Sequence, residues 1–140
     1  VLDRALALCR PGAYQIQAAI SALHAQATRA EETDWFQIAL LYSELVRLNG
    51  SLVVRLNWAV AVAMASKPAH GLTLLAELDA DGGLKKYRHF HAARADLLRR
   101  AGDWQSACEA YRTTLNLTQN TVERAFLQRR LLEVQTKLDG

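Results

Sequence analysis

The sequence predicts an all-α fold made of antiparallel helix hairpins. Of its 140 residues 51% are apolar, and alanine and leucine dominate, which favours helices. Helix breakers are scarce, with two prolines and seven glycines. No segment alternates convincingly between polar and apolar residues, as a half-buried strand does, so we expect no sheet.

Two stretches of the chain share one helix–turn–helix spacing, 36 residues apart. In each, a small residue is followed three positions later by a large one and twelve positions later by a second small one. The two sets are Ala59, Val62, Gly71, Leu75 and Leu78, and Ala95, Leu98, Ala107, Tyr111 and Thr114. This spacing is typical of tetratricopeptide (TPR) hairpins, whose usual period is about 34 residues. It predicts a TPR-like superhelical stack, in which small residues let the helices approach closely.

Three helices are expected before residue 50. Residues 1–9 read as the tail of a helix that stops at Pro11-Gly12, and a second helix covers about 14–27. The polar stretch 28–34 is a loop, in which Thr33 or Asp34 caps a third helix over about 35–48. The expected inner faces of the second and third helices are Ile16, Ala19, Ile20 and Leu23, and Trp35, Ile38, Ala39, Tyr42, Leu45 and Val46.

The middle of the chain predicts two helices. Asn49-Gly50-Ser51 ends one helix and caps the next, over 52–65. That helix is apolar on nearly all sides and is expected to be central, although it is too short to span a bilayer. Pro68 opens a helix that runs to about residue 78, because proline is tolerated in a first turn. Asp81-Gly82-Gly83 then forms a turn.

The last part of the chain predicts three more elements. A basic helix covers 84–101 and could break near Tyr87. Gly102-Asp103 turns into a helix over 104–117, and Asn120 with Glu123 forms a capping box for a final helix over 121–138. In this final helix we expect an apolar inner stripe of Val122, Phe126, Leu131, Val134 and Leu138, and outward-pointing Arg124, Arg129 and Arg130.

Together these elements predict one domain over 1–140. Its hairpins cover about 14–48, 52–78 and 84–117, and the helix over 121–138 caps the stack. A closing helix with one polar face suits the end of a stacked array.

The sequence shows no arrangement typical of catalysis or of a cofactor site. His89 and His91 are two residues apart, which on a helix points them to different sides and makes a poor chelate. His24 and His70 lack spaced acidic or cysteine companions. There is no nucleophile motif and no glycine-rich phosphate loop. We therefore expect a protein that is not an enzyme and that binds no metal and no cofactor.

The remaining reactive side chains have ordinary structural explanations. Glu31, Glu32 and Asp34 precede a helix, where acidic residues usually cap and solvate its start. Cys9 and Cys108 have no CxxC spacing, so we interpret them as small buried residues in a reducing compartment. No secretory leader is recognisable, and the abrupt start in helical sequence suggests a fragment.

Basic residues concentrate on one segment of the chain. The net charge of +3 is far from the dense basic stripe of a nucleic-acid-binding domain. Projecting the repeat onto the segment places on the concave face His89, Ala92, Asp96, Arg99 and Arg100, with Lys85, Lys86, Arg88 and Arg94 nearby. One interpretation is a solvated helix face. The other is a groove for an acidic segment of another domain or protein, attracted by charge.

The same projection onto the earlier repeat gives an apolar set. It comprises Val53, Leu56, Val60 and Ala63. We expect these residues to pack on the preceding helices rather than to contact a ligand. The Lys/Asn carboxylate clamp of chaperone-binding TPR domains is not found at the equivalent positions, which disfavours a chaperone adaptor.

A series of short motifs runs in order through most of the chain. It comprises Tyr14-Gln15-Ile16-Gln17-Ala18-Ala19-Ile20, His24-Ala25, Thr33-Asp34-Trp35, Gln37-Ile38, Tyr42, Leu56-Asn57, Ala59-Val60-Ala61-Val62-Ala63, Arg94-Ala95-Asp96-Leu97-Leu98 and Glu123-Arg124-Ala125-Phe126-Leu127. This series resembles the C-terminal extension of a bacterial subfamily of extracytoplasmic-function (ECF) RNA polymerase sigma factors, over about residues 1–132. Trp58 and Gly50 depart from it, since the family more often has Arg and Pro there.

The resemblance implies a function for a longer parent protein. In that family a TPR-like extension follows the DNA-binding sigma regions 2 and 4, which this chain does not contain. The chain would be the later part of a cytoplasmic regulatory or scaffolding domain. Its partners would be sigma regions 2 and 4 of the same chain or the RNA polymerase core, with no direct contact to DNA or membrane. The alternative is a free-standing TPR-like adaptor that binds a peptide or protein.

Eight residues near these motifs and on the basic helix are candidate interaction residues. They are Gln17, His24, Trp35, Asn57, His91, Arg94, Arg99 and Arg100. Trp35 could instead be a packed aromatic, and Asn57 a buried amide bonded to backbone. Arg99 and Arg100 could simply be solvated.

Overall fold

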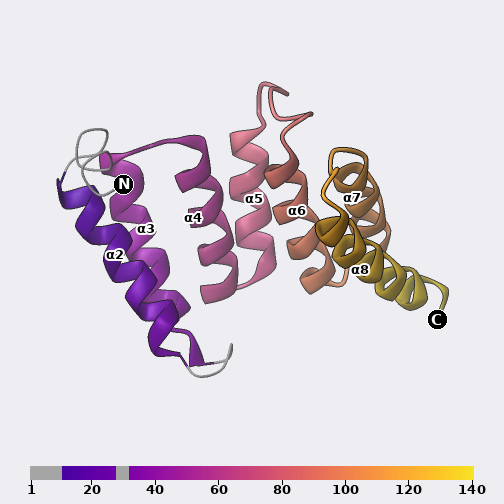
Figure 1. The fold of residues 1–140 in the computed structure, drawn as a ribbon, viewed down its shortest axis with the longest axis horizontal. Helices are drawn as coiled ribbons and strands as arrows, with labels where there is room; N and C mark the ends of the chain where they lie inside the picture. Colours follow the sequence, from indigo (N-terminus) through magenta and orange to yellow (C-terminus); the bar gives the residue numbers. More distant parts are fainter. Residues whose placement is uncertain (1–10, 28–31) are drawn as a thin grey trace. The chain divides into compact units, whose positions relative to one another are not determined.

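The computed structural model describes residues 11–27 and 32–140 (Figure 1). Within these residues the protein is all-α, as predicted, with seven helices and no strand. The helices are α2 (Pro11–Gln26), α3 (Trp35–Leu48), α4 (Leu52–Ala65), α5 (Pro68–Leu78), α6 (Arg88–Ala101), α7 (Trp104–Asn116) and α8 (Thr121–Asp139). The helix predicted over 1–9, together with Cys9 and Glu31, lies outside the described residues.

The predicted start signals explain where several helices begin. The Asp34 carboxylate accepts a hydrogen bond from the Gln37 backbone N–H at 3.1 Å and caps α3. The Ser51 hydroxyl oxygen accepts one from the Val54 N–H at 3.4 Å and caps α4. Each bond satisfies an N–H that the first turn of a helix leaves without an intrahelical partner.

Two predicted helix starts differ from the structure. Helix α2 begins at Pro11 rather than at about residue 14, because proline has no N–H to lose in a first turn. The basic helix begins at Arg88 and not at residue 84, so it starts at the break predicted near Tyr87. Residues 80–86 form turns instead, because the Asp79 carboxylate accepts from the Leu84 N–H at 3.1 Å and Gly82 takes a φ of 72°.

The chain divides into two compact units, Val1–Ser66 and Lys67–Gly140. The division falls between α4 and α5, inside the hairpin predicted over 52–78. That hairpin, and the single domain over 1–140, therefore stay predictions.

The first unit has its own core. In it α3 packs against both α2 and α4. The buried residues of the cluster are Ala13, Ile20, Ile38, Tyr42, Leu45, Val54 and Ala61. Ala19 is exposed, contrary to prediction, because the buried stripe of α2 runs through Ala13 and Ile20. Val53 is also exposed, at 53%, whereas Leu56 and Ala63 are buried as expected.

The core of the second unit is a separate cluster on α6, α7 and α8. It comprises Ala95, Leu98, Ala107, Cys108, Ala110, Tyr111, Leu115, Leu127 and Val134. Ala95 and Ala107 have no exposed surface, as expected of small residues where α6 and α7 pack together. Cys108 is a buried free thiol, also as predicted.

The last helix differs from its prediction in which face it buries. Leu127 and Val134 are buried, with Leu131 packed beside them, whereas Val122, Phe126 and Leu138 are 79%, 48% and 44% exposed. The buried stripe, with spacing i, i+4 and i+7, therefore contains Leu131 and Val134 as predicted, but Leu127 in place of the other expected residues. Consequently α8 exposes apolar side chains beside polar ones such as Arg129, which is exposed as predicted.

Arg124 was expected to point outward, and it does not. Its guanidinium Nη1 donates to the Leu115 and Thr118 carbonyls at 2.6 and 3.0 Å. These carbonyls lie at and just beyond the end of α7, where cations favour the last carbonyls of a helix, and the Leu115 carbonyl also accepts from the Thr118 N–H at 3.1 Å. At the start of α8 the Asn120 side chain caps the Glu123 N–H at 2.9 Å, and the Glu123 carboxylate pairs with Arg88.

Candidate functional site

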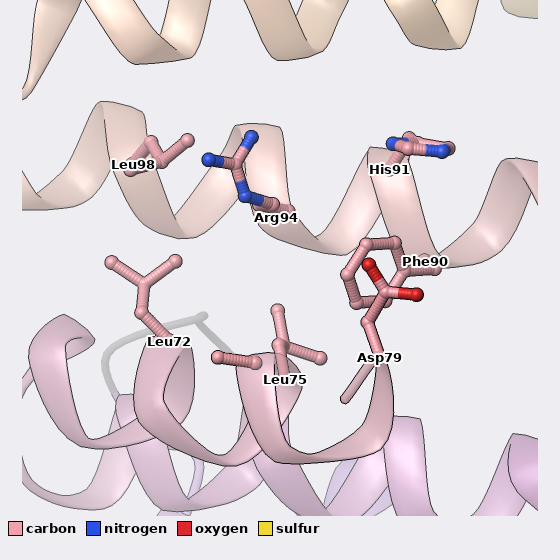
Figure 2. Close-up of a pocket in the computed structure, with 8 residues that line it drawn as sticks. Leu72, Leu75, Asp79, Phe90, His91, Arg94 and Leu98 are labelled. Carbon is pink, nitrogen blue, oxygen red and sulfur yellow. The ribbon is translucent and has the colours of Figure 1, made fainter. Parts of the chain in front are cut away.

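The best candidate site is a groove between α5 and α6, both in the second unit (Figure 2). Its volume is about 460 Å³, within the range of about 300–1,000 Å³ typical of ligand pockets. The lining residues are Leu72, Leu75, Ala76, Asp79, Phe90, His91, Arg94 and Leu98. We call this feature the α5–α6 groove.

The α5–α6 groove changes character along its length, as Figure 2 shows. Leu72 on α5 and Leu98 on α6 form an aliphatic end. Leu75 lies at the middle, with Arg94 on the facing helix. The third part is polar and aromatic and contains Asp79, Phe90 and His91. This order follows from the sequence, because residues three and four apart share one face of a helix.

Two hydrogen bonds fasten the turn between α5 and α6 to the polar end of the groove. The Asp79 carboxylate accepts from the Leu84 N–H at 3.1 Å. The His91 Nε2 lies 2.8 Å from the Lys85 carbonyl oxygen, and since a carbonyl only accepts, Nε2 is the nitrogen that carries the proton. The backbone of Lys85 therefore lies at this end of the groove, and Lys85 and Lys86 are exposed residues of the same turn.

Arg94 is the half-buried cation of the groove. In the described part of the chain no carboxylate or carbonyl pairs with its guanidinium, whereas Asp79 and His91 already hold backbone groups of the turn. A guanidinium presents five N–H donors in a planar fork, which suits a carboxylate. The groove thus combines an aliphatic surface with a cation that can accept an anionic partner.

Arg99 and Arg100 occupy a different environment. Both pair with the Asp96 carboxylate, Arg99 through Nη2 at 2.7 Å and Arg100 through Nε at 2.9 Å. The Nε of Arg99 also donates to the Tyr111 hydroxyl at 3.3 Å. Burial alone would lower the pKa of Arg99, but the bonds to Asp96 and Tyr111 outweigh it and the pKa is raised. Asp96 therefore offsets one of the two positive charges of Arg99 and Arg100 within α6.

The other predicted interaction residues lie in the first unit. Gln17, His24 and Asn57 are exposed, so Asn57 is not the buried amide of the alternative interpretation. Trp35 is half-buried against the core, with its ring centroid 5.3 Å from that of His24, as a packed aromatic would be. Of the eight predicted residues, His91 and Arg94 are the two that line the α5–α6 groove.

The sequence reasoning missed most of the groove lining, namely Leu72, Leu75, Ala76, Asp79, Phe90 and Leu98. A usable signal was present. Leu72, Leu75 and Asp79 are three and four residues apart, so they lie on one face of a helix. Leu98, Arg94 and His91 have the same kind of spacing when the sequence is followed from the C-terminal side. Pairing the two series antiparallel would have located the groove.

Neither a metal-binding cluster nor a membrane-spanning helix occurs in the described part of the chain. Residues 11–27 and 32–140 contain no group of three or more His, Cys, Asp or Glu side chains placed to hold a metal ion. No helix in the same ranges is both long enough and apolar enough to cross a membrane.

Comparison with known proteins finds a relative that matches most of this chain. The chain is 42% identical over 131 residues to an uncharacterized protein of Rhizobium meliloti (strain 1021). The match covers 94% of this chain and 30% of that protein, so the chain spans less than a third of its relative's length. No protein-family profile matches the chain. No solved structure matches it either.

Proposed function

We propose that this chain is a TPR-like protein-interaction domain, without enzymatic activity, that holds an acidic segment of a partner in the α5–α6 groove. The observation that carries this proposal is Arg94, a cation without a described partner beside an aliphatic surface. An anionic segment could pair with the guanidinium while its apolar side chains cover the leucines. Such a groove binds and positions a partner.

We propose that the parent protein is an ECF sigma factor that acts in the cytoplasm, and that this chain belongs to its regulatory extension. The ordered motifs from Tyr14 to Leu127 support this proposal through their resemblance to that family. The domain would contact sigma regions 2 and 4 of the same chain or the RNA polymerase core. Regulation requires two states of this contact that differ in free energy, so that a signal can shift their populations.

A transcription reporter driven by the full-length parent tests both parts of the proposal. Arg94→Glu reverses the charge in the groove, and we expect it to change promoter output at equal protein level. Arg112→Glu is the matched control, because Arg112 is exposed on α7 and does not line the groove. Unchanged output from Arg94→Glu would remove the groove from the mechanism.

Arg94 is a sharper test position than Arg99 and Arg100. Reversing the charge of Arg99 would break its bonds to Asp96 and to the largely buried Tyr111, and would disturb the packing of α6 on α7. A change in output would then have two explanations. The alternative function, a free-standing adaptor, is tested by the sequence of the complete gene, because an adaptor would lack sigma regions 2 and 4.

A further inference from the structure

We infer that the α5–α6 groove recognises a polypeptide segment that carries an aliphatic side chain at one end of the bound stretch and acidic side chains next to it, in either chain direction. The inference deepens the proposed function and rests on it for the existence of a protein partner. It names the chemistry of that partner, which the function alone leaves open.

This arrangement follows from the polarity of the groove. Its aliphatic end, formed by Leu72 and Leu98, has no charged lining residue, so it suits a leucine-like side chain. Arg94 comes next along α6 and suits a carboxylate. The turn that carries the exposed Lys85 and Lys86 lies beyond it, held by the bond between His91 and the Lys85 carbonyl, and its two positive charges favour acidic residues at this end.

Asp79 sets a limit on how the segment can lie. Its carboxylate is the negative group of the lining, and it disfavours an anion placed against α5 at the polar end. One of its oxygens is held by the Leu84 N–H at 3.1 Å. The acidic part of the segment is therefore expected to run along α6 and the lysines, away from Asp79.

The open form of the groove favours a polypeptide over a small organic acid. Pockets for small molecules usually bury 70–90% or more of their ligand. The α5–α6 groove is instead partly open to solvent. A segment that enters at one end and leaves at the other suits such a shape, and a side-chain carboxylate is then the group that reaches Arg94.

Panning a random peptide display library against the chain tests the inference without the parent protein. We expect enrichment of peptides with an aliphatic residue on one side of a stretch of acidic residues, in either chain direction. An enriched peptide, synthesised with both ends blocked and labelled with a fluorophore, should bind the chain with an affinity that falls when its acidic residues are replaced by amides. No enrichment, or enrichment without this arrangement, would overturn the inference.

Variants of the chain locate the binding. Arg94→Gln should weaken the binding of the blocked peptide at least about tenfold, because hydrogen bonds to charged groups contribute that much. Arg94→Lys should recover part of the affinity, since lysine keeps the charge but loses the planar fork. Arg112→Gln, an exposed change on α7, should leave it unchanged. Equal loss in both glutamine variants would mean nonspecific attraction and would also overturn the inference.

Two further outcomes are informative. Binding only by peptides with a free C-terminus would show recognition of a terminal carboxylate and would contradict the side-chain assignment. Peptide binding that depends on Arg94, with no change in the parent's promoter output, would support this inference and overturn the proposed regulatory role of the groove. The two proposals can therefore fail separately.

Discussion

Single residues in the second unit show how tightly α6 and α7 pack. Ala95 and Ala107 are completely buried in the core cluster that also contains Tyr111. A methyl side chain at these positions fixes how closely the two helices approach. A larger side chain would have to displace its neighbours, because protein interiors are packed about as densely as organic crystals.

We expect Ala95→Leu and Ala107→Leu each to lower the free energy of unfolding by about 1–3 kcal/mol through overpacking. Urea titration followed by circular dichroism measures this loss. Ala125→Leu is the matched control because Ala125 is exposed on α8, and it should change stability by less than about 0.5 kcal/mol. Equal effects at all three positions would contradict close packing at the α6–α7 contact.

The pKa of Tyr111 gives a prediction about pH. Burial raises its pKa above 10.0, and this outweighs the opposing effect of the hydrogen bond from Arg99. The folded protein therefore holds the hydroxyl proton when the unfolded chain has released it. The stability that depends on this proton is complete below about pH 10 and is lost as the pH rises through the folded-state pKa.

We therefore expect the free energy of unfolding to fall above about pH 10, and to fall less steeply in Tyr111→Phe. Denaturant titrations at several alkaline pH values measure the slope. Tyr14→Phe serves as the control, because Tyr14 is 39% exposed and lies in the first unit. A slope unchanged by Tyr111→Phe would show that the buried hydroxyl does not account for the loss.

At the level of helices, the end of α7 illustrates how buried polar groups are satisfied. The Thr114 hydroxyl donates to the Ala110 carbonyl at 2.7 Å, and the Thr118 hydroxyl donates to the Thr114 carbonyl at 2.6 Å. Both threonines are buried. Arg124 from α8 then binds the Leu115 and Thr118 carbonyls, so two helices share one cap.

We expect Arg124→Ala to lower the free energy of unfolding by about 1–2 kcal/mol, because charged hydrogen bonds are lost and water replaces them only in part. Arg129→Ala, an exposed change on the same helix, should have little effect. Thermal unfolding of the two variants measures the difference in their stability. Equal stability of both would mean that Arg124 does not act as a cap.

The sequence predicted helices better than it predicted which faces they bury. Capping side chains such as Asp34 and Ser51 act within one turn, so local sequence is sufficient to locate the helix starts. The buried face of α8 could not be chosen in this way, because apolar residues such as Val122 and Leu127 lie on different sides of the helix. Only packing against α7 selects one side.

The candidate site shows the same division between local and tertiary information. Arg94 and His91 were selected from a basic helix by sequence alone. The different behaviour of Arg94 and Arg99, however, depends on contacts across helices. Arg99 meets Tyr111 of α7, whereas Arg94 faces leucines of α5. Sequence spacing within α6 carries no information about which arginine has which neighbour.

At the scale of the molecule, the two units have separate cores. The cluster of the first unit ends at Ala61, and the cluster of the second begins at Ala95, with Leu72 packed against it. The α5–α6 groove belongs entirely to the second unit. Folding of the second unit, and any binding in its groove, therefore have their main contacts within Lys67–Gly140.

We expect a fragment comprising Lys67–Gly140 to fold on its own. It contains the complete α6–α7–α8 core and all the lining of the groove. Its stability should be low, because a small domain buries a smaller fraction of its surface than a large one. The fragment should nevertheless give a helical circular dichroism spectrum and unfold cooperatively, and it should bind the peptides selected on the whole chain. A fragment without helical signal would show that the second core requires the first unit. A helical fragment that no longer binds would show that the first unit supplies part of the binding surface.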